Sequence, residues 1–221
     1  MPRITLSFDN GPDPEVTPRV LDVLDKERLR ASFFVLGDKL RDRARRAACE
    51  RARDEGHWIG NHTFNHIVPL GLSPDPNIAT KEIARTQELL GNLSDERRLF
   101  RPFGGRGNIG KHLLNRSALD LLVRGKYTCV LWNAIPGDWE DPDGWVERGL
   151  GECFAIDWAL VVLHDLPTGA MDHLERFIQL AREDGATFVQ DFPPECVPLI
   201  RGRILAPMEP YVAAPLSAHS G

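Results

Sequence analysis

The chain has 221 residues, a formal net charge of -5 and a hydrophobic fraction of 42%, which together are typical of one α/β domain with a sizeable core. An acidic chain without a clustered basic face is not expected to bind nucleic acid. No apolar run approaches the roughly 20 residues that cross a bilayer, so we expect no membrane partner.

Apolar runs alternate with amphipathic segments in the first part of the chain. Short runs rich in β-branched and aromatic residues predict buried strands, and apolar residues at helical spacing predict helices. In chain order we expect a strand at Arg3–Phe8, a helix at Glu15–Arg30, a strand at Ala31–Leu36, a helix at Asp38–Glu55 and a strand at His57–Asn61.

The same alternation continues after a loop. Residues 67–77 contain three prolines and a glycine, which predicts a loop, and we expect this loop and the C-terminal tail to border the reaction pocket. In chain order we then expect a helix at Thr80–Leu90, a strand at Arg98–Arg101, a helix at Ile109–Val123, a strand at Tyr127–Trp132, a helix at Pro142–Cys153, a strand at Trp158–Leu163, a helix at Asp172–Glu183 and a strand at Ala186–Val189.

Regular alternation of strand and helix predicts parallel strands covered by helices. Polar clusters follow most of the strands, which favours an α/β barrel over an open sheet because a barrel gathers its reactive side chains at the carboxyl ends of its strands. No linker divides the chain. We expect a single domain at residues 1–203 and a proline-rich C-terminal extension at 204–221.

The four cysteines are far apart and form no CxxC pair, so we expect buried free thiols in a reducing compartment. The N-terminus lacks the apolar segment of a secretory leader, and this favours a cytoplasmic protein. The sequence leaves the oligomeric state open, and a homo-oligomer is possible.

Two of the polar clusters contain an acid and a pair of histidines. Asp9 ends the first strand and precedes a Gly-Pro turn that could aim it into a pocket, although such a turn is more often only a turn. His62 and His66 are four residues apart, so on one helical turn they would face the same way and could grip one metal ion. Taken alone, this histidine spacing is more often incidental.

Three further clusters follow later strands. Arg101 could pair with an acid, or could simply face solvent beside the Gly104–Gly105 turn, whose N–H groups could stabilise an oxyanion. His164 follows a fully apolar strand and is a natural acid or base near neutral pH. Asp138 could orient this histidine. The clusters together favour one shared site more strongly than any of them alone.

The clusters, in this order, resemble the motifs of the polysaccharide deacetylase family (NodB homology domain, similar to carbohydrate esterase family 4). The motifs of that family run TFDDGP, H-S/T-x-x-H, R-P-P-Y-G, D-x-x-D-W and L-x-H. The resemblance covers residues 3 to about 190 and implies a distorted (β/α) barrel with about seven parallel strands. The chain offers SFDNGP at 7–12, HTFNH at 62–66, RPFGG at 101–105, GDW at 137–139 and LHD at 163–165.

The resemblance implies a hydrolase that cleaves an acetyl amide or ester on a carbohydrate with the help of a divalent metal, zinc being the expected ion. Asp9 would be the general base, held by Arg101, and His164 the general acid, oriented by Asp138. Gly104, Trp139 and Leu163 would contact substrate. The metal ligands would be His62, His66 and Asn10.

The chain departs from the family pattern at three positions. Asn10 replaces the aspartate that is the third metal ligand, so the ligand set loses its only negative charge unless Asp9 or Asp13 compensates. Gly104, without a gap in the motif, replaces a tyrosine, and the aromatic wall of the pocket is then expected to be lost. Asn133 stands where the fourth motif often has aspartate.

These departures keep two alternatives open. The first is a cytoplasmic, metal-poor amidohydrolase of a small cyclic amide, similar to allantoinase-like relatives of the family. The second is an inactive, carbohydrate-binding homologue, which Asn10 alone would support. The substrate, a small molecule or a carbohydrate polymer, is not decided by the sequence.

Overall fold

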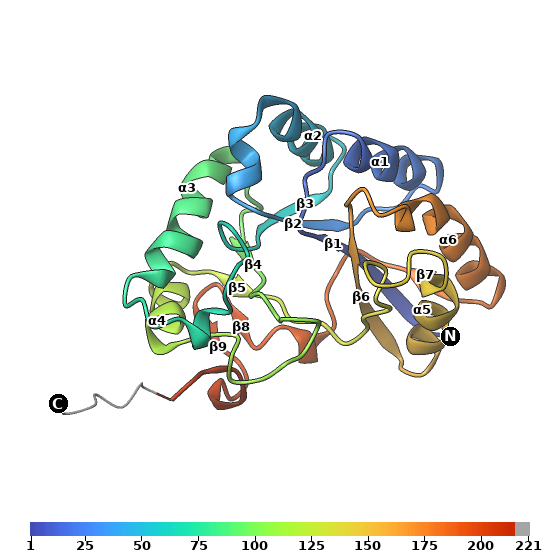
Figure 1. The fold of residues 1–221 in the computed structure, drawn as a ribbon. Helices are drawn as coiled ribbons and strands as arrows, with labels where there is room; N and C mark the ends of the chain where they lie inside the picture. Colours follow the sequence, from blue (N-terminus) through green and yellow to red (C-terminus); the bar gives the residue numbers. More distant parts are fainter. Residues whose placement is uncertain (215–221) are drawn as a thin grey trace.

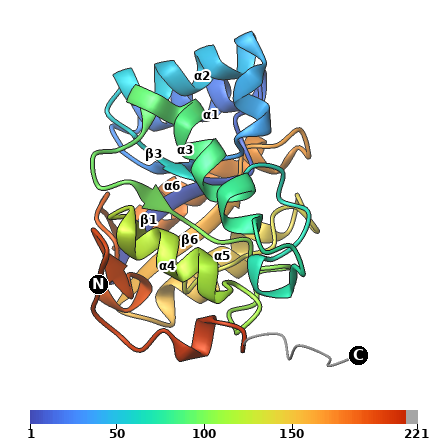
Figure 2. The same ribbon diagram turned by 90° about the vertical axis from the view of Figure 1, so that its left-hand side faces the viewer.

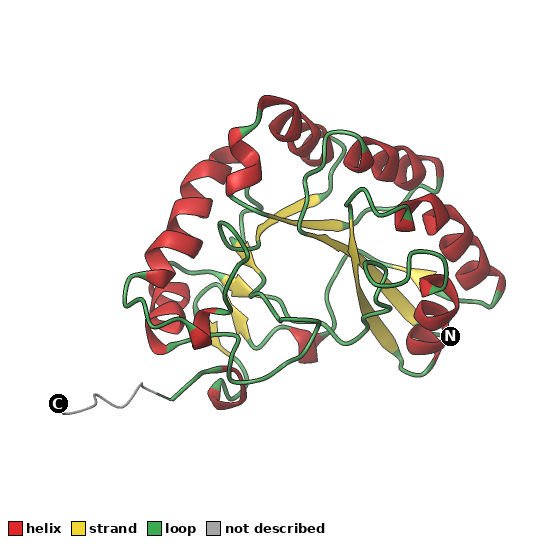
Figure 3. Ribbon diagram, in the orientation of Figure 1, coloured by secondary structure: helices red, strands yellow, loops and turns green. Residues whose placement is uncertain are grey.

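The computed structural model describes residues 1–214, in which a mostly parallel sheet curls into a half-barrel with helices on its outer face (Figures 1 and 3). The strands are β1 (Arg3–Asp9), β2 (Ser32–Val35), β3 (Trp58–Asn61), β4 (Leu99–Phe100), β5 (Thr128–Cys129), β6 (Trp158–His164), β7 (Thr187–Phe188), β8 (Leu199–Ile200) and β9 (Arg203–Ile204). The helices are α1 (Val16–Lys26), α2 (Arg43–Asp54), α3 (Arg85–Leu90), α4 (Arg116–Arg124), α5 (Trp145–Phe154) and α6 (Leu174–Glu183). A 3₁₀ turn, η1 (Asp38–Arg41), precedes α2, and a π-helical turn, η3 (Thr80–Ala84), precedes α3.

The strands run in the order β6-β1-β2-β3-β4-β5-β8-β9, and β7 pairs with Arg3 and Ile4 at the N-terminal end of β1. Strands β1 to β7 pair in parallel, as the sequence predicts for a barrel. A parallel bridge between Ala134 and Val161 brings the chain after β5 against β6. Because these strands are parallel, their carboxyl ends all lie on one side of the fold.

Asn133 has a structural reason for being an amide. Its Nδ2 donates a hydrogen bond to the Trp158 carbonyl at 3.0 Å, and its Oδ1 accepts one from the Leu160 N–H at 2.7 Å. The side-chain amide thus makes the pair of hydrogen bonds to β6 that the backbone of a neighbouring strand would make. A carboxylate could accept the second bond but could not donate the first. The asparagine found here in place of the family's aspartate therefore serves to join the chain after β5 to β6.

The hairpin β8–β9 was not predicted. Its two strands are two residues each, too short for a periodic signal, and they are joined at Arg201 and Gly202, which both have positive φ. It pairs antiparallel with β5 at the edge of the sheet. Such a short element depends on tertiary pairing, which the local sequence does not encode.

The first part of the expected C-terminal extension lies against the fold (Figure 2). Leu114 donates a hydrogen bond to the Tyr211 carbonyl at 3.0 Å and accepts one from the Ala213 N–H at 2.8 Å. Met208 is buried in the cluster of apolar side chains that surrounds α4. The expected domain boundary at residue 203 stays a prediction, and residues 215–221 of the extension lie outside the described residues.

The alternation of side chains along β1 separates the two faces of the sheet. Ile4, Leu6 and Phe8 join the main core under α1, α2, α5 and α6, while Ser7 and Asp9 point to the inside of the half-barrel. All four cysteines are buried free thiols, as expected. Within residues 1–214, no helix is both long and apolar enough to cross a membrane.

Four α-helices begin three or more residues later than the sequence pattern indicated, which are α2 and α3, preceded by η1 and η3, and α4 and α5. Helix α4 begins at Arg116 because Asn115 is its N-cap, accepting a hydrogen bond from the Ala118 N–H at 2.9 Å. Helix α5 begins at Trp145 rather than Pro142, and Asp141 accepts a hydrogen bond from the Gly144 N–H in the turn before it. Thr80, where a helix was expected to begin, lies inside η3.

Candidate active site

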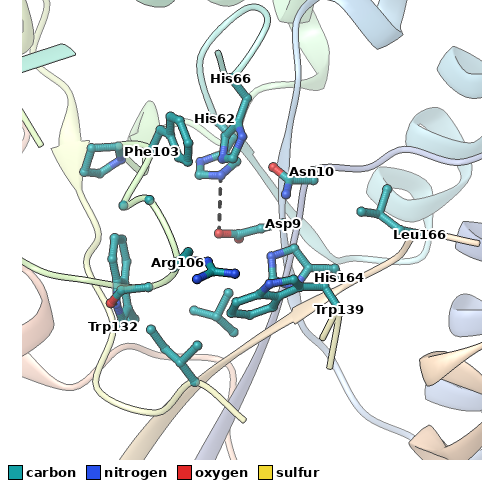
Figure 4. Close-up of a pocket in the computed structure, with 16 residues that line it drawn as sticks. Asp9, Asn10, His62, His66, Phe103, Arg106, Trp132, Trp139, His164 and Leu166 are labelled. Carbon is teal, nitrogen blue, oxygen red and sulfur yellow. Dashed lines mark hydrogen bonds and ion pairs between the residues drawn. The ribbon is translucent and has the colours of Figure 1, made fainter. Parts of the chain in front are cut away.

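A cavity of about 350 Å³ lies at the carboxyl ends of β1, β3 and β6 (Figure 4). Asp9 and His164 are directly paired across β1 and β6, so both side chains project from the same edge of the sheet. The cavity is lined by Asp9, Asn10, His62, His66, Pro102, Phe103, Gly104, Gly105, Arg106, Gly107, Trp132, Ile135, Trp139, Val162, His164 and Leu166.

The carboxylate of Asp9 is paired with the buried guanidinium of Arg101. Arg101 is fully buried and its Nη1 lies 2.7 Å from Asp9 Oδ1 and 2.8 Å from Ser7 Oγ. Its remaining donors reach the carbonyls of Val130 and Leu131, both at 3.3 Å. A buried cation needs such partners. Asp9 Oδ2 is left facing the cavity, 3.5 Å from His62 Nε2.

His62 and His66 approach each other, but not on a helix. Thr63 and His66 have φ of 70° and 56°, so the segment is a tight turn, and the expected helical turn is wrong. The two ring centroids nevertheless lie 4.8 Å apart. His62 Nδ1 lies 2.9 Å from the Arg101 carbonyl and donates to it, which leaves the Nε2 lone pair directed at the cavity (Figure 4).

Both histidines are neutral at neutral pH. Burial lowers the pKa of His62 to about 3. Burial also lowers the pKa of His66 to about 3, and a charge on neighbouring His62 would lower it further. A neutral imidazole keeps a lone pair, which is the form that binds a metal ion.

The residues around His62 and His66 fit a divalent metal through neutral donors. Asn10 has φ of 68°, and within residues 1–214 its buried Oδ1, at the edge of the same cavity, has no hydrogen-bond partner. Because buried polar atoms are normally paired, this oxygen is a candidate third ligand. Among the described residues no three His, Cys, Asp or Glu side chains gather to hold a metal, which is consistent with an amide at the third position.

Asp13 does not compensate for the missing charge. Its Oδ1 accepts hydrogen bonds from the N–H groups of Glu15 and Val16 at 3.0 and 2.9 Å, at the start of α1. It is absent from the cavity wall. Asp9 is committed to Arg101 through one oxygen. The candidate ligands His62, His66 and Asn10 carry no charge of their own, and the nearest free carboxylate oxygen is Asp9 Oδ2, 3.5 Å from His62 Nε2.

Asp138 grips His164 at two points. Its Oδ2 accepts a hydrogen bond from the His164 backbone N–H at 2.8 Å, and its Oδ1 lies 2.9 Å from His164 Nδ1. Burial opposes a charge on the ring, but the hydrogen bond and the negative charge of Asp138 outweigh it and raise the pKa of His164. Trp139 packs edge-on against the ring at 4.8 Å. Nε2 is left as the ring nitrogen that can exchange a proton with substrate.

The aromatic wall expected to be lost at Gly104 is present. Phe103 lines the cavity and packs against His66 with 3.7 Å between ring centroids. Trp132 forms the opposite wall, fixed by a bond from its Nε1 to the Gly107 carbonyl at 2.8 Å. Phe103, one residue before Gly104, therefore supplies an aromatic ring to the cavity wall.

Gly104 is required by the closeness of Trp132. A Cβ at this position would lie 2.5 Å from Trp132 Cζ2, so the indole would have to move. Gly104→Ala is expected to raise KM and to lower the free energy of unfolding by about 1–3 kcal/mol, the usual cost of overpacking. Steady-state kinetics and urea unfolding measure both. Gly151→Ala in α5, where a Cβ meets nothing, is the control and should change neither unfavourably.

Leu163 does not line the cavity. It belongs to the core on the opposite face of β6, because neighbouring residues of a strand point to opposite faces. Val162, on the same face as His164, lines the cavity instead, together with Leu166. No residue of 67–77 or 204–214 lines it either, so their expected role at its border is not supported.

Arg106 was missed by the sequence reasoning. It lies at the mouth of the cavity (Figure 4), with 82% of its side chain exposed and Nη2 3.2 Å from Glu140 Oε1. Arg106, Ile135 and Trp139 also form part of a second cavity of about 490 Å³, which adjoins the first. The sequence feature that could have indicated Arg106 is its position two residues beyond Gly104, in a glycine-rich stretch.

Asp165 is a buried acid behind the site. Burial raises its pKa to about 7, although Thr17 donates a hydrogen bond to Oδ2. Its Oδ1 has no partner. In the unfolded chain an aspartate has a pKa of about 3.9. Between these two values the folded state binds more protons than the unfolded state, so this residue makes stability fall as the pH rises from about 4 to about 7.

Asp165→Asn should abolish the fall in stability that the titration of Asp165 causes as the pH rises. The stability of the variant relative to wild type is expected to rise between pH 5 and pH 8, because each unit of pKa shift corresponds to about 1.4 kcal/mol. Urea unfolding of both proteins at the two pH values measures the difference. A difference that is the same at both pH values would contradict a raised pKa in the folded state.

Comparison with known proteins gives the class of the chain. The family model described as polysaccharide deacetylase matches residues 1–121. A peptidoglycan-N-acetylglucosamine deacetylase of Bacillus cereus is 30% identical over 192 residues, with 84% of this chain and 66% of the relative covered. A chitooligosaccharide deacetylase of Rhizobium leguminosarum bv. trifolii is 32% identical, with 73% of this chain and 71% of the relative covered.

A solved structure supports the same assignment. The family 4 acetyl xylan esterase from Clostridium thermocellum, in complex with a cobalt ion, is 26% identical, has a TM-score of 0.67, and is matched over 85% of this chain and 87% of that one. The chain belongs to the polysaccharide deacetylase family. It spans about two thirds of the length of the Bacillus cereus relative.

Proposed function

We propose that the chain is a hydrolase that removes acetyl groups from N-acetylated carbohydrate with the help of a divalent metal. The observation that carries this proposal is the convergence in one cavity of Asp9, backed by Arg101, with His164, backed by Asp138. An acid–base pair whose members are each fixed by a buried, oppositely charged partner is suited to general acid–base catalysis. The relatives named above are deacetylases and an esterase.

Asp9 and His164 divide the proton transfers. Asp9 Oδ2, the oxygen not bonded to Arg101, takes the proton from the attacking water. The raised pKa of His164 keeps its ring protonated to higher pH than an ordinary histidine, so Nε2 can give a proton to the departing nitrogen. Arg101 and Asp138 keep both side chains oriented and are themselves fully buried.

His62, His66 and Asn10 are the residues that would hold the metal, on the fit of their neutral donors described above. When bound there, a divalent ion would polarise the acetyl carbonyl and lower the pKa of water towards neutrality. The N–H of Gly104, which donates to no backbone carbonyl among the described residues, would stabilise the developing oxyanion. Phe103, Trp132 and Val162 enclose a small apolar group such as acetyl.

The direct test is acetate release from an N-acetylated chitooligosaccharide and from peptidoglycan fragments, with zinc or cobalt supplied. Wild type is expected to release acetate, and Asp9→Asn to lose most of this activity while staying folded. Asp22→Asn, at an exposed aspartate of α1, is the control and should behave as wild type. Equal rates for wild type and Asp9→Asn would count against the proposal.

The family relationship does not favour the cyclic-amide alternative, because the matched relatives act on carbohydrate by name. The inactive homologue remains an outcome of the same experiment. A folded wild type that binds chitooligosaccharide but releases no acetate under any metal would identify it.

A further inference from the structure

The turn that carries the two histidines is held in an unfavourable backbone conformation. Thr63, a β-branched residue, and His66 both have positive φ, a region that such residues rarely adopt. Conformations of this kind persist only where surrounding groups fix them. The position of His66 relative to His62 therefore depends on what holds residues 63–65.

One buried carboxylate outside the cavity holds the middle of this turn. Glu82 Oε2 accepts hydrogen bonds from the backbone N–H groups of Phe64 and Asn65 at 2.8 and 3.1 Å. Glu82 is only 6% exposed. Charge-assisted bonds of this type are stronger than neutral ones. Without them, two N–H groups beside the histidines would lose their acceptor.

Glu82 lies in the π-helical turn η3, which is also bonded to Asn61 at the end of β3. The Ile83 carbonyl, which follows it, accepts a bond from Asn61 Nδ2 at 2.9 Å rather than serving only the helix. Asn61 Oδ1 in turn accepts from the Thr63 N–H at 3.0 Å. Such π turns occur frequently at functional sites. η3 thus holds the start of the histidine turn through Asn61 and its middle through Glu82.

We propose that Glu82 is a positioning residue for the metal site: its carboxylate fixes the 62–66 turn so that the two imidazoles face one ion. The inference rests on the proposed function, since it concerns the same site. Glu82 reaches the turn only through backbone N–H groups and does not line the cavity. Its effect is therefore on metal affinity and geometry rather than on proton transfer.

The test is cobalt binding to wild type and to Glu82→Gln and Glu82→Leu, followed by absorption in the visible range. Glu82→Leu removes the hydrogen-bond acceptor. The Kd of this variant for cobalt is expected to be about 10–100-fold higher than that of wild type, the usual effect of losing a residue that supports a metal ligand. Gln keeps an oxygen acceptor without the charge and should lie between Leu and wild type. The visible spectrum of bound cobalt should change in Glu82→Leu.

Glu88 is the matched control. It is an exposed acid on α3, and the described residues show no hydrogen bond from it to the turn, so Glu88→Leu should keep wild-type cobalt affinity and spectrum. A folded Glu82→Leu that also keeps both would overturn the proposal. Should Glu82→Leu fail to fold, the comparison of Glu82→Gln with Glu88→Gln decides, and equal cobalt affinity in these two variants would overturn it.

Failure of the proposed function gives a different result. If wild type binds no cobalt, amide hydrogen exchange of the 62–66 segment in metal-free protein decides the role of Glu82. Faster exchange of Phe64 and Asn65 in Glu82→Gln than in Glu88→Gln would support positioning of the turn. Identical exchange in the two variants would overturn it.

Discussion

Asp138→Asn is expected to lower kcat for acetate release by about 10²–10⁴-fold, the usual share of general acid–base catalysis. Asp138 bonds both the backbone N–H and Nδ1 of His164, at 2.8 and 2.9 Å. An asparagine can retain one of these bonds through its oxygen but carries no charge to support a protonated ring. His164 would then be both less protonated and less well oriented.

The pH dependence separates this effect from simple misfolding. His164 must be protonated to act as the acid, so activity falls as the pH rises through its pKa. The bond and charge of Asp138 raise that pKa, so in Asp138→Asn the upper limb of the kcat profile should move to lower pH. Asp143→Asn, at a side chain that is 96% exposed, is the control and should leave rate and profile unchanged. An unshifted upper limb in Asp138→Asn would contradict the assignment of His164.

Asn10→Asp is expected to tighten zinc or cobalt binding by more than about 10-fold, because it adds a charged ligand where now only an amide oxygen is available. The backbone should accept the change, since aspartate, like asparagine, tolerates the positive φ of residue 10. Isothermal titration of metal-free protein with zinc measures the affinity.

Asn65→Asp controls for charge alone. It adds the same charge within the histidine turn, but residue 65 is exposed and does not line the cavity. Its effect on zinc affinity should be much smaller than that of Asn10→Asp. Equal effects of the two substitutions, or none from Asn10→Asp, would mean that residue 10 does not point at the metal.

The sequence predicted most of the fold because each long element carries its own periodicity. β1 alternates apolar with polar residues over its seven positions, β6 begins with six apolar residues, and α6 has a clear apolar stripe, so their positions follow from local pattern. The acidic residue and the histidines that line the cavity were found through their place at strand ends, whereas Arg106, Trp132 and Val162 were not found. Asp9, His62 and His164 all come directly at or after such ends.

The errors share one cause, which is that side-chain direction is set in three dimensions. A shift of one residue along β6 exchanges Leu163 for Val162 at the cavity. In the third motif the aromatic ring of the cavity wall comes from Phe103, the neighbour of the glycine at which the ring was expected to be lost. Glu82 is distant in sequence from the histidines it supports, and its π turn follows from tertiary contacts that the local pattern does not contain.

The binding of a divalent metal by His62, His66 and Asn10 is tested most directly by elemental analysis of protein purified without chelator or affinity metal, with His62→Ala as the paired sample. Wild type is expected to contain about one zinc, cobalt or nickel ion per chain, and His62→Ala to contain almost none. Wild type without metal, even after incubation with excess zinc, would contradict a metal-assisted deacetylase.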